Sequence, residues 1–252
     1  MIGIFDSGSG GLSVFRELHK LLPKENYIYY SDNAHCPYGE KSREYITDRA
    51  RFITDFLLEK GADIIVVACN TATAAAISTL RAEYPEVPFI GMEPAIKPAV
   101  KKTKTGVVGV LATAGTLKAD KYLNTREKWA EGVRIAEHIG QGFVELVESG
   151  NTNNPETEDI VQESLKPLLE EGADVVVLGC THYPFLSETI NKVAKKLYPE
   201  RELTIIDPAP AVAKHTLEVM IKDSLITENG YGMELHASGD DRNLINLYNT
   251  LT

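Results

Sequence analysis

Two cysteines, Cys69 and Cys180, end two similar stretches of the sequence. The chain has EKGADIIVVAC over 59–69 and EEGADVVVLGC over 170–180. Each stretch combines a helix end, a turn glycine, an acidic residue and a β-branched apolar run, which is typical of a buried parallel strand. The residue after such a strand lies at the carboxyl edge of the sheet, where open α/β folds bind ligands. We therefore predict a two-thiol active site with one cysteine from each of two similar halves.

Polar residues near each cysteine indicate how protons could be handled. A free cysteine is most often a small buried hydrophobe, but the duplicated context favours a function for these two. Both precede predicted helices, whose N-terminal dipoles favour a thiolate. His182 lies two residues after Cys180 and could hold or relay a proton, and Asp6, at the end of the first strand, could do the same for Cys69. Cys36 has no counterpart in the second half, and we interpret it as a structural loop residue.

The elements that must position these residues alternate between strand and helix along the whole chain. This alternation predicts an α/β fold with two pseudo-symmetric lobes, each a mainly parallel sheet flanked by helices, and an active site in the cleft between them. We expect residues 1–96 and 211–252 to form the lobe that carries Cys69, and residues 97–210 the lobe that carries Cys180. The segment from 211 onward has no second copy, and we expect it to pack on the first half.

The first strand, 2–5, leads into a glycine-rich turn, DSGSGG at 6–11. The turn matches neither dinucleotide nor P-loop spacing and has no lysine to reach phosphates, so we interpret it as a place where backbone approaches a small ligand. A second strand, 27–30, precedes the segment SDNAHCPYGEKS over 31–42, which we expect to lie outside the core because it is polar and rich in turn residues. Ser42 is predicted to cap a helix that runs to about Lys60.

Composition excludes several classes of protein. The chain has 252 residues, 43% hydrophobic and 25% charged, with a net charge of −10, so it lacks the basic surface of a nucleic-acid-binding protein. No apolar run approaches the ~20 residues of a membrane span. Three cysteines without a C-x-x-C pair, and six histidines without metal-ligand spacing, predict free thiols and no metal. The N-terminus MIGIFDSG does not have the pattern of a secretory signal, so we expect a cytoplasmic protein.

Five motifs together resemble those of bacterial glutamate racemases, within the aspartate/glutamate racemase superfamily. They are GIFDSGSGGLSV, DNAHCPYGEKS, VACNTATA, LGCTHYPFL and HASGD, and they cover essentially the whole chain. The resemblance implies cofactor-independent interconversion of L- and D-glutamate, which supplies D-glutamate for peptidoglycan. It implies Cys69 and Cys180 as the acid/base pair, assisted by Asp6 and His182. It also implies substrate contacts at Ser7, Tyr38, Gly39, Asn70, Thr71, Thr113, Thr181 and Glu148.

This chemistry explains why two thiols would be needed. Racemisation removes the α-hydrogen from one face of the carbon and returns a proton to the other, so one acid/base group is required on each face. Reacting atoms lie about 3–3.5 Å apart, so we expect the two sulfurs to be roughly 6–8 Å apart in a closed cleft and to stay reduced.

Three alternatives remain open from the sequence. A racemase or isomerase for another small acid, such as aspartate or maleate, would share both thiols. A cysteine hydrolase would use one thiol with His182 and would form a covalent intermediate. A non-catalytic binding protein would hold an acidic metabolite without exchanging its α-hydrogen. The sequence also leaves open whether the chain acts alone or as a homodimer.

Overall fold

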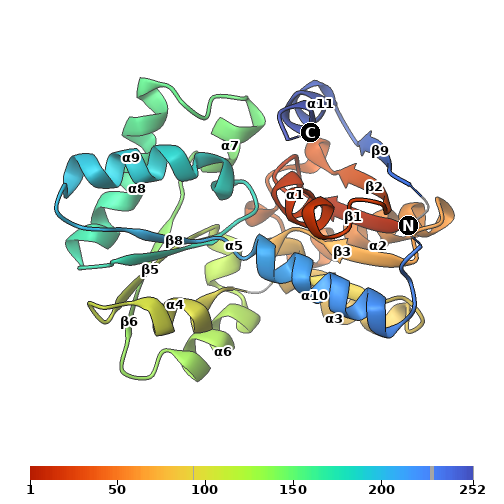
Figure 1. Ribbon diagram of the computed structural model, residues 1–252, viewed down its shortest axis with the longest axis horizontal. Helices are drawn as coiled ribbons and strands as arrows, with labels where there is room; N and C mark the ends of the chain where they lie inside the picture. Colours follow the sequence, from red (N-terminus) through yellow and green to blue (C-terminus); the bar gives the residue numbers. More distant parts are fainter. Residues whose placement is uncertain (93, 228–229, 252) are drawn as a thin grey trace. The chain divides into compact units, whose positions relative to one another are not determined.

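The computed structural model describes residues 1–92, 94–227 and 230–251. The chain forms two compact units, Met1–Met92 with Ala209–Thr252, and Glu93–Pro208 (Figure 1). Each unit contains one sheet, and every strand pairing among the described residues is parallel. Helices flank both sheets. The predicted α/β class, with parallel sheets between helices, is confirmed.

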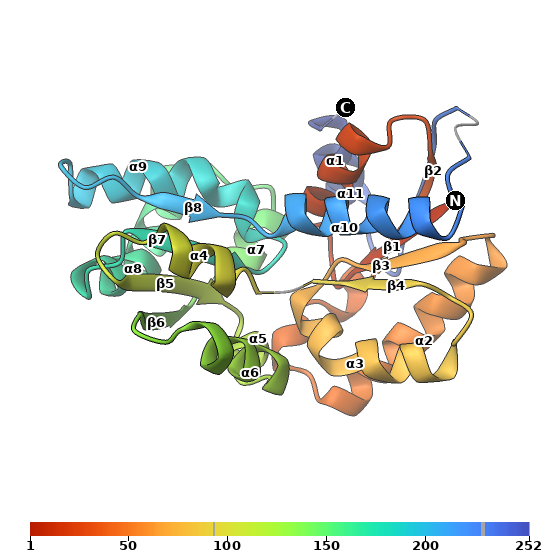
Figure 2. The same cartoon turned by 60° about the horizontal axis from the view of Figure 1, so that its bottom comes forward.

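The sheet of the first unit has five strands in the order β4-β3-β1-β2-β9. Helices α2 and α3 cover one face, and α1 and α10 pack against each other on the other face (Figure 2). The elements are β1 (Ile2–Asp6), α1 (Leu12–Leu21), β2 (Asn26–Ser31), the 3₁₀ turns η1 (Asn33–His35) and η2 (Tyr38–Glu40), α2 (Arg43–Glu59), β3 (Ile64–Val67), α3 (Asn70–Glu83), β4 (Phe89–Gly91), α10 (Ala209–Lys222), β9 (Gly232–Ala237) and α11 (Arg242–Asn249).

The central strand of this sheet, β1, and its neighbour β3 are buried along their whole length because helices cover both faces. Alternate side chains point to opposite faces of a strand, so Phe5, Ile65 and Val67 form one core with α2 and α3. Ser42 accepts a hydrogen bond from the backbone N of Tyr45 and begins α2, as predicted. This packing fixes the level at which β1 and β3 end, and so the position of the residues that follow them.

The sheet of the second unit has four strands in the order β6-β5-β7-β8. Helices α8 and α9 lie on one face, and α4 and α6 on the other (Figure 1). The elements are α4 (Ile96–Lys102), β5 (Val107–Ala112), α5 (Ala114–Leu117), α6 (Asp120–Trp129), β6 (Arg134–Ile139), α7 (Phe143–Glu148), α8 (Pro155–Glu170), β7 (Val175–Gly179), the 3₁₀ turn η3 (Tyr183–Leu186), α9 (Ser187–Leu197) and β8 (Thr204–Ile206).

The two sheets share one topology. The order β4-β3-β1-β2 in the first unit corresponds to β8-β7-β5-β6 in the second. The repeated stretches of sequence form β3 and β7, which occupy equivalent positions next to the first strand of each unit. Cys69 and Cys180 therefore follow equivalent strands, as the repeat predicts.

The segment after β8 belongs to the first unit. Strand β9 pairs with β2 at the edge of the first sheet, and α10 packs against α1 and β4. In the described part of the chain, none of the helices has the length and apolar character needed to span a membrane.

Candidate active site

Cys69 lies between β3 and α3 and acts as the N-cap of the helix. Its Sγ accepts a hydrogen bond from the backbone N of Ala72 at 3.4 Å, and Ser7 Oγ lies 3.8 Å from the same sulfur. Ser7 comes this close because β1 and β3 are neighbouring parallel strands that end at the same edge. The side chain is buried. A sulfur that accepts an N–H at a helix start is in a field that favours the thiolate, the form that can remove a proton.

Asp6 orders the glycine-rich turn that carries Ser7. Its Oδ2 accepts hydrogen bonds from the backbone N of Gly8, at 3.3 Å, and of Gly11, at 3.0 Å. The hydroxyl of Tyr29 also binds this turn, because it donates a hydrogen bond to the carbonyl oxygen of Gly8 at 2.8 Å. A Cβ on Gly11 would lie 2.7 Å from Tyr29 Oη and 2.8 Å from Asp6 Cβ, so only glycine fits there. Asp6 thus has a structural task at this edge, and its role as helper of Cys69 stays a prediction.

Asn70 is a buried side chain at this edge whose hydrogen bonding is incomplete. It is the first residue of α3 and only 6% exposed, yet neither its Oδ1 nor its Nδ2 has a hydrogen-bond partner within the described residues. A buried amide left unbonded costs free energy of about 1–3 kcal/mol, so such a group is expected to meet a polar ligand. Thr71, the next residue, is also buried. Backbone N–H groups at this helix start add further donors for an anion.

The segment 31–42 is not outside the core, and that expectation was wrong for three of its residues. Ser31, Asp32 and Tyr38 are all buried, with Asp32 fully so. The polar residues are accommodated because Asp32 is paired with Arg49 of α2, and Tyr38 donates its hydroxyl proton to Asp32. The η2 turn, which holds Tyr38 and Gly39, packs against α3. Cys36 lies between η1 and η2 and is half-buried.

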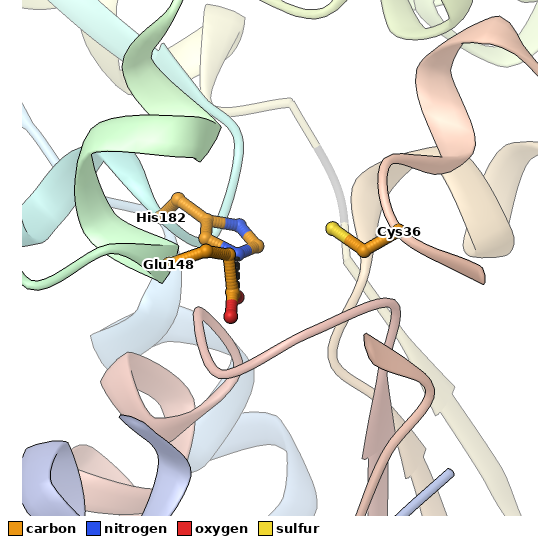
Figure 3. A group of neighbouring side chains, drawn as sticks. All are labelled: Cys36, Glu148 and His182. Atoms are coloured by element: carbon orange, nitrogen blue, oxygen red, sulfur yellow. Dashed lines mark hydrogen bonds and ion pairs between the residues drawn. The ribbon is translucent and has the colours of Figure 1, made fainter. Parts of the chain in front are cut away.

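In the second unit, Cys180 follows β7 and is buried. The Nδ1 atom of His182 lies 3.7 Å from its sulfur, and Nε2 of the same ring lies 2.6 Å from Glu148 Oε1 (Figure 3). The third side chain drawn in Figure 3, Cys36, belongs to the first unit. Glu148 is the last residue of α7. An ionised carboxylate only accepts hydrogen bonds, so it holds the ring proton on Nε2 and leaves Nδ1 to exchange a proton with the thiol.

Three more residues complete this edge of the second sheet. Thr113 follows β5 and caps α5, where its Oγ1 accepts from the backbone N of Thr116 at 3.2 Å. Thr181 is buried directly after Cys180. Tyr183 packs against the ring of Phe143 and donates to the carbonyl oxygen of Gly140 at 3.3 Å. Burial raises the pKa of Tyr183 well above its usual value, with added effects from Cys180 and Glu145, so the phenol stays neutral.

The structure therefore brings the predicted site residues to the carboxyl edges of the two sheets. The first unit contains Cys69 and Asp6 together with Ser7, Tyr38, Gly39, Asn70 and Thr71. The second unit contains Cys180 and His182 together with Thr113, Glu148 and Thr181. The separation of the two sulfurs, expected at roughly 6–8 Å, stays a prediction.

Two groups at these edges are absent from the sequence-based interpretation. The pairing of Glu148 with His182 was not anticipated, although Glu148 itself was named as a substrate contact. The second group is Asp32 with Arg49. A signal for Asp32 existed, because it follows β2 directly and polar residues after a buried strand lie at the ligand edge.

Comparison with known proteins shows which family this chain belongs to. Residues 2–216 match the family model for Asp/Glu/hydantoin racemase. The glutamate racemase of Stutzerimonas stutzeri is 44% identical over 243 residues, which is 96% of this chain and 90% of that protein. Glutamate racemase RacE1 of Bacillus anthracis superposes with a TM-score of 0.86 at 31% identity, over 99% of this chain and 92% of that one. The Francisella tularensis glutamate racemase in complex with D-glutamate gives a TM-score of 0.83 at 27% identity, covering 99% and 92%.

The fold of two parallel α/β units matches that of known glutamate racemases, which defines the chain as a racemase, an enzyme of the isomerase class. The chain belongs to the Asp/Glu/hydantoin racemase family. The resemblance to glutamate racemases seen in the sequence motifs is confirmed by these relatives.

Proposed function

We propose that this protein interconverts L- and D-glutamate without a cofactor, using Cys69 and Cys180 as the two acid/base groups. The observation that carries the proposal is the equivalence of the two thiols. Each follows the corresponding strand of a shared topology, and each has a polar partner within 4 Å, Ser7 Oγ at 3.8 Å and His182 Nδ1 at 3.7 Å. A reaction that treats two faces of one carbon alike requires two such groups.

In one direction, one cysteine removes the α-proton as a thiolate while the other, as a thiol, protonates the opposite face. The roles exchange in the reverse direction. A thiol has a pKa of about 8.5, far below that of an α-carbon hydrogen, so the carbanion-like transition state must be stabilised by other groups. A turnover of about 10 per second corresponds to a barrier of roughly 16 kcal/mol.

The donors that could provide this stabilisation are already fixed in place. The unbonded amide of Asn70 and the N–H groups at the start of α3 lie beside Cys69, and the hydroxyls of Thr113 and Thr181 lie at the edge that carries Cys180. Preorganised donors of this kind are the main source of electrostatic stabilisation in enzymes. We assign them to the substrate carboxylates.

Glutamate is proposed as the substrate because the matched relatives are named glutamate racemases over nearly their full length. D-glutamate for peptidoglycan synthesis in the cytoplasm is the corresponding biological role in this proposal. Circular dichroism of the purified protein with L-glutamate, L-aspartate and L-glutamine tests the assignment. Among the three amino acids, we expect only L-glutamate to lose its circular-dichroism signal completely. The loss should occur with chelator-treated protein as well as with untreated protein. Decay with L-aspartate but not L-glutamate would contradict it.

One observation favours a second candidate, a cysteine hydrolase. In a hydrolase, Cys180 would be the nucleophile, His182 its base and Glu148 the carboxylate that orients the base. Thiol hydrolases have this arrangement. A hydrolase would form a covalent adduct on Cys180 and would not need Cys69. Loss of the reaction in Cys69→Ser, with no adduct detected by mass spectrometry, separates the two functions in favour of the racemase.

A further inference from the structure

Asp32 is a fully buried carboxylate of the first unit whose two oxygens both accept hydrogen bonds. Arg49 binds it with both arms of its guanidinium, Nε to Oδ2 at 2.9 Å and Nη2 to Oδ1 at 2.7 Å. Tyr38 Oη donates to Oδ2 at 2.5 Å, and the hydroxyl of Ser238 also helps to lower the pKa of this carboxyl. Burial alone would raise the pKa of Asp32, but the bonds from Arg49 and Tyr38 lower it below its usual value. The carboxylate therefore stays ionised and has no proton to exchange with a substrate.

The loop that holds Tyr38 is fastened to the C-terminal segment at the same place. The backbone N of Ala34 donates to Ser238 Oγ at 3.0 Å, and the backbone N of Gly239 donates to Asn33 Oδ1 at 2.8 Å. Asn33 in turn donates to the carbonyl oxygen of Asp240. The motif HASGD at 236–240 spans the end of β9, which pairs with β2, and so reaches this loop along the sheet edge. This is a role for a motif that the two-thiol chemistry does not use.

Tyr38 connects this network to the reactive thiol. Its ring is 1% exposed and lies in the same buried cluster as Cys69, and η2 packs against α3. Burial, the charge of Asp32 and the hydrogen bond to it raise the pKa of Tyr38 far above its usual value, and negative charge on Cys69 raises it further. The phenol is therefore neutral, and its single proton is directed at Asp32 and away from the thiolate.

We propose that Asp32, held by Arg49, is a positioning residue that sets the loop 33–40 and the ring of Tyr38 beside Cys69, and so completes the substrate-binding edge. This inference rests on the proposed function, because its effect is measured on racemisation. A bidentate arginine fixes both distance and orientation of a carboxylate, whereas a lysine supplies only a point charge. The position of the Asp32 carboxylate thus sets the position of the Tyr38 ring through one hydrogen bond. Through the loop, it also sets the position of Gly39.

The test compares Arg49→Lys, Tyr38→Phe and Ser238→Ala with the control Arg51→Lys. Arg51 lies on the same helix and also binds a carboxylate with both arms, that of Glu83 at 2.7 and 2.8 Å, but Glu83 is exposed and contacts none of the site residues named above. Steady-state racemisation of glutamate gives kcat and KM for each protein, and thermal unfolding shows which variants are folded at the assay temperature.

We expect KM to rise about tenfold in Arg49→Lys and in Tyr38→Phe, with kcat changed less than about threefold, because positioning of the binding loop is lost while both thiols remain. Ser238→Ala should show the same direction of change with a smaller rise. Arg51→Lys should keep wild-type KM within about twofold, whatever its melting temperature. A KM effect absent from the control separates positioning from general stability.

The double variant Arg49→Lys/Tyr38→Phe is the sharper measurement. If both residues act through Asp32, its KM matches that of the worse single variant, whereas Arg51→Lys/Tyr38→Phe shows the product of the two single effects. Unchanged KM in Arg49→Lys, or multiplied effects in the first double variant, would overturn the positioning role while wild-type protein still racemises glutamate. Wild-type protein without racemase activity would overturn the proposed function instead, and this inference with it.

Discussion

At the scale of single residues, each thiol has a different means of controlling its proton. Cys69 accepts an N–H at the start of α3 and has Ser7 as neighbour, whereas Cys180 faces an imidazole whose far nitrogen is held by Glu148. The two sites are equivalent in topology but not in chemistry. His182 with Glu148 can take up and return a proton, so the Cys180 side has the stronger dependence on a titratable helper.

Replacing Glu148 with glutamine should therefore lower kcat about ten- to a hundredfold, because the ring of His182 loses the carboxylate that fixes its tautomer. The effect on kcat/KM should be equal in both directions, since the equilibrium constant of racemisation is one. Glu145→Gln is the matched control, as Glu145 is exposed on the same helix. Equal activity of the two variants in a circular-dichroism assay would remove Glu148 from the mechanism.

At the scale of elements, the ends of β3 and β7 place the thiols, and the helices that follow depend on them. Cys69 serves both as reactive group and as N-cap of α3. The repeat of sequence predicted both strands and their shared position, because a buried β-branched run bounded by turn residues is a local signal. A local signal marks Asp32 as a residue of the ligand edge, because it directly follows β2, but its hydrogen-bond network could not be found from local sequence. Its burial depends on Arg49 from α2 and Ser238 from the far end of the chain, and no local pattern connects those three positions.

Two substitutions at Cys69 separate its role as N-cap of α3 from its proposed role as an acid/base group. A serine hydroxyl can still accept the N–H of Ala72, whereas alanine cannot, so Cys69→Ala should be less stable than Cys69→Ser by about 1 kcal/mol. Both should lack racemase activity, since neither has a thiol. Urea unfolding and a glutamate assay on the same samples measure the two properties. Activity retained in Cys69→Ser would contradict the acid/base role, and equal stabilities would contradict the cap.

At the scale of the whole molecule, the same four-strand topology occurs twice, and each copy fixes the beginning of its central strand with an acidic residue. In the second unit, Asp174 at the start of β7 holds the turn before β5, with bonds from Thr103, Lys104 and Thr105. In the first unit Asp63, at the equivalent place before β3, binds the amino group of Met1 before β1. The acidic residue of the repeated stretch thus serves the fold at the edge opposite the thiols.

This arrangement has a consequence for stability against pH. Burial raises the pKa of Asp174, but its hydrogen-bond donors lower it more, so the net pKa lies below the usual value. A carboxyl whose pKa is lowered by folding stabilises the protein above its unfolded pKa, and that stabilisation is lost as pH falls through the folded pKa. Asp174→Asn should therefore lower the melting temperature at pH 7, and the difference from wild type should shrink as pH falls below about 4.

The control for this prediction is Asp159→Asn, because Asp159 is exposed on α8 of the same unit. Its melting temperature should follow that of wild type at every pH. A destabilisation by Asp174→Asn that stays constant or grows between pH 7 and pH 3 would show that the hydrogen bonds do not depend on the ionised carboxylate.

The two-thiol mechanism is tested most directly by following L-glutamate in heavy water with NMR. Because one thiol removes the α-hydrogen and the other returns a proton from solvent, the D-glutamate formed first should carry deuterium at the α-carbon. The L-glutamate recovered at the same early time should still carry hydrogen. Deuterium that enters unreacted L-glutamate as fast as D-glutamate forms would mean that one group serves both faces, and would contradict the account.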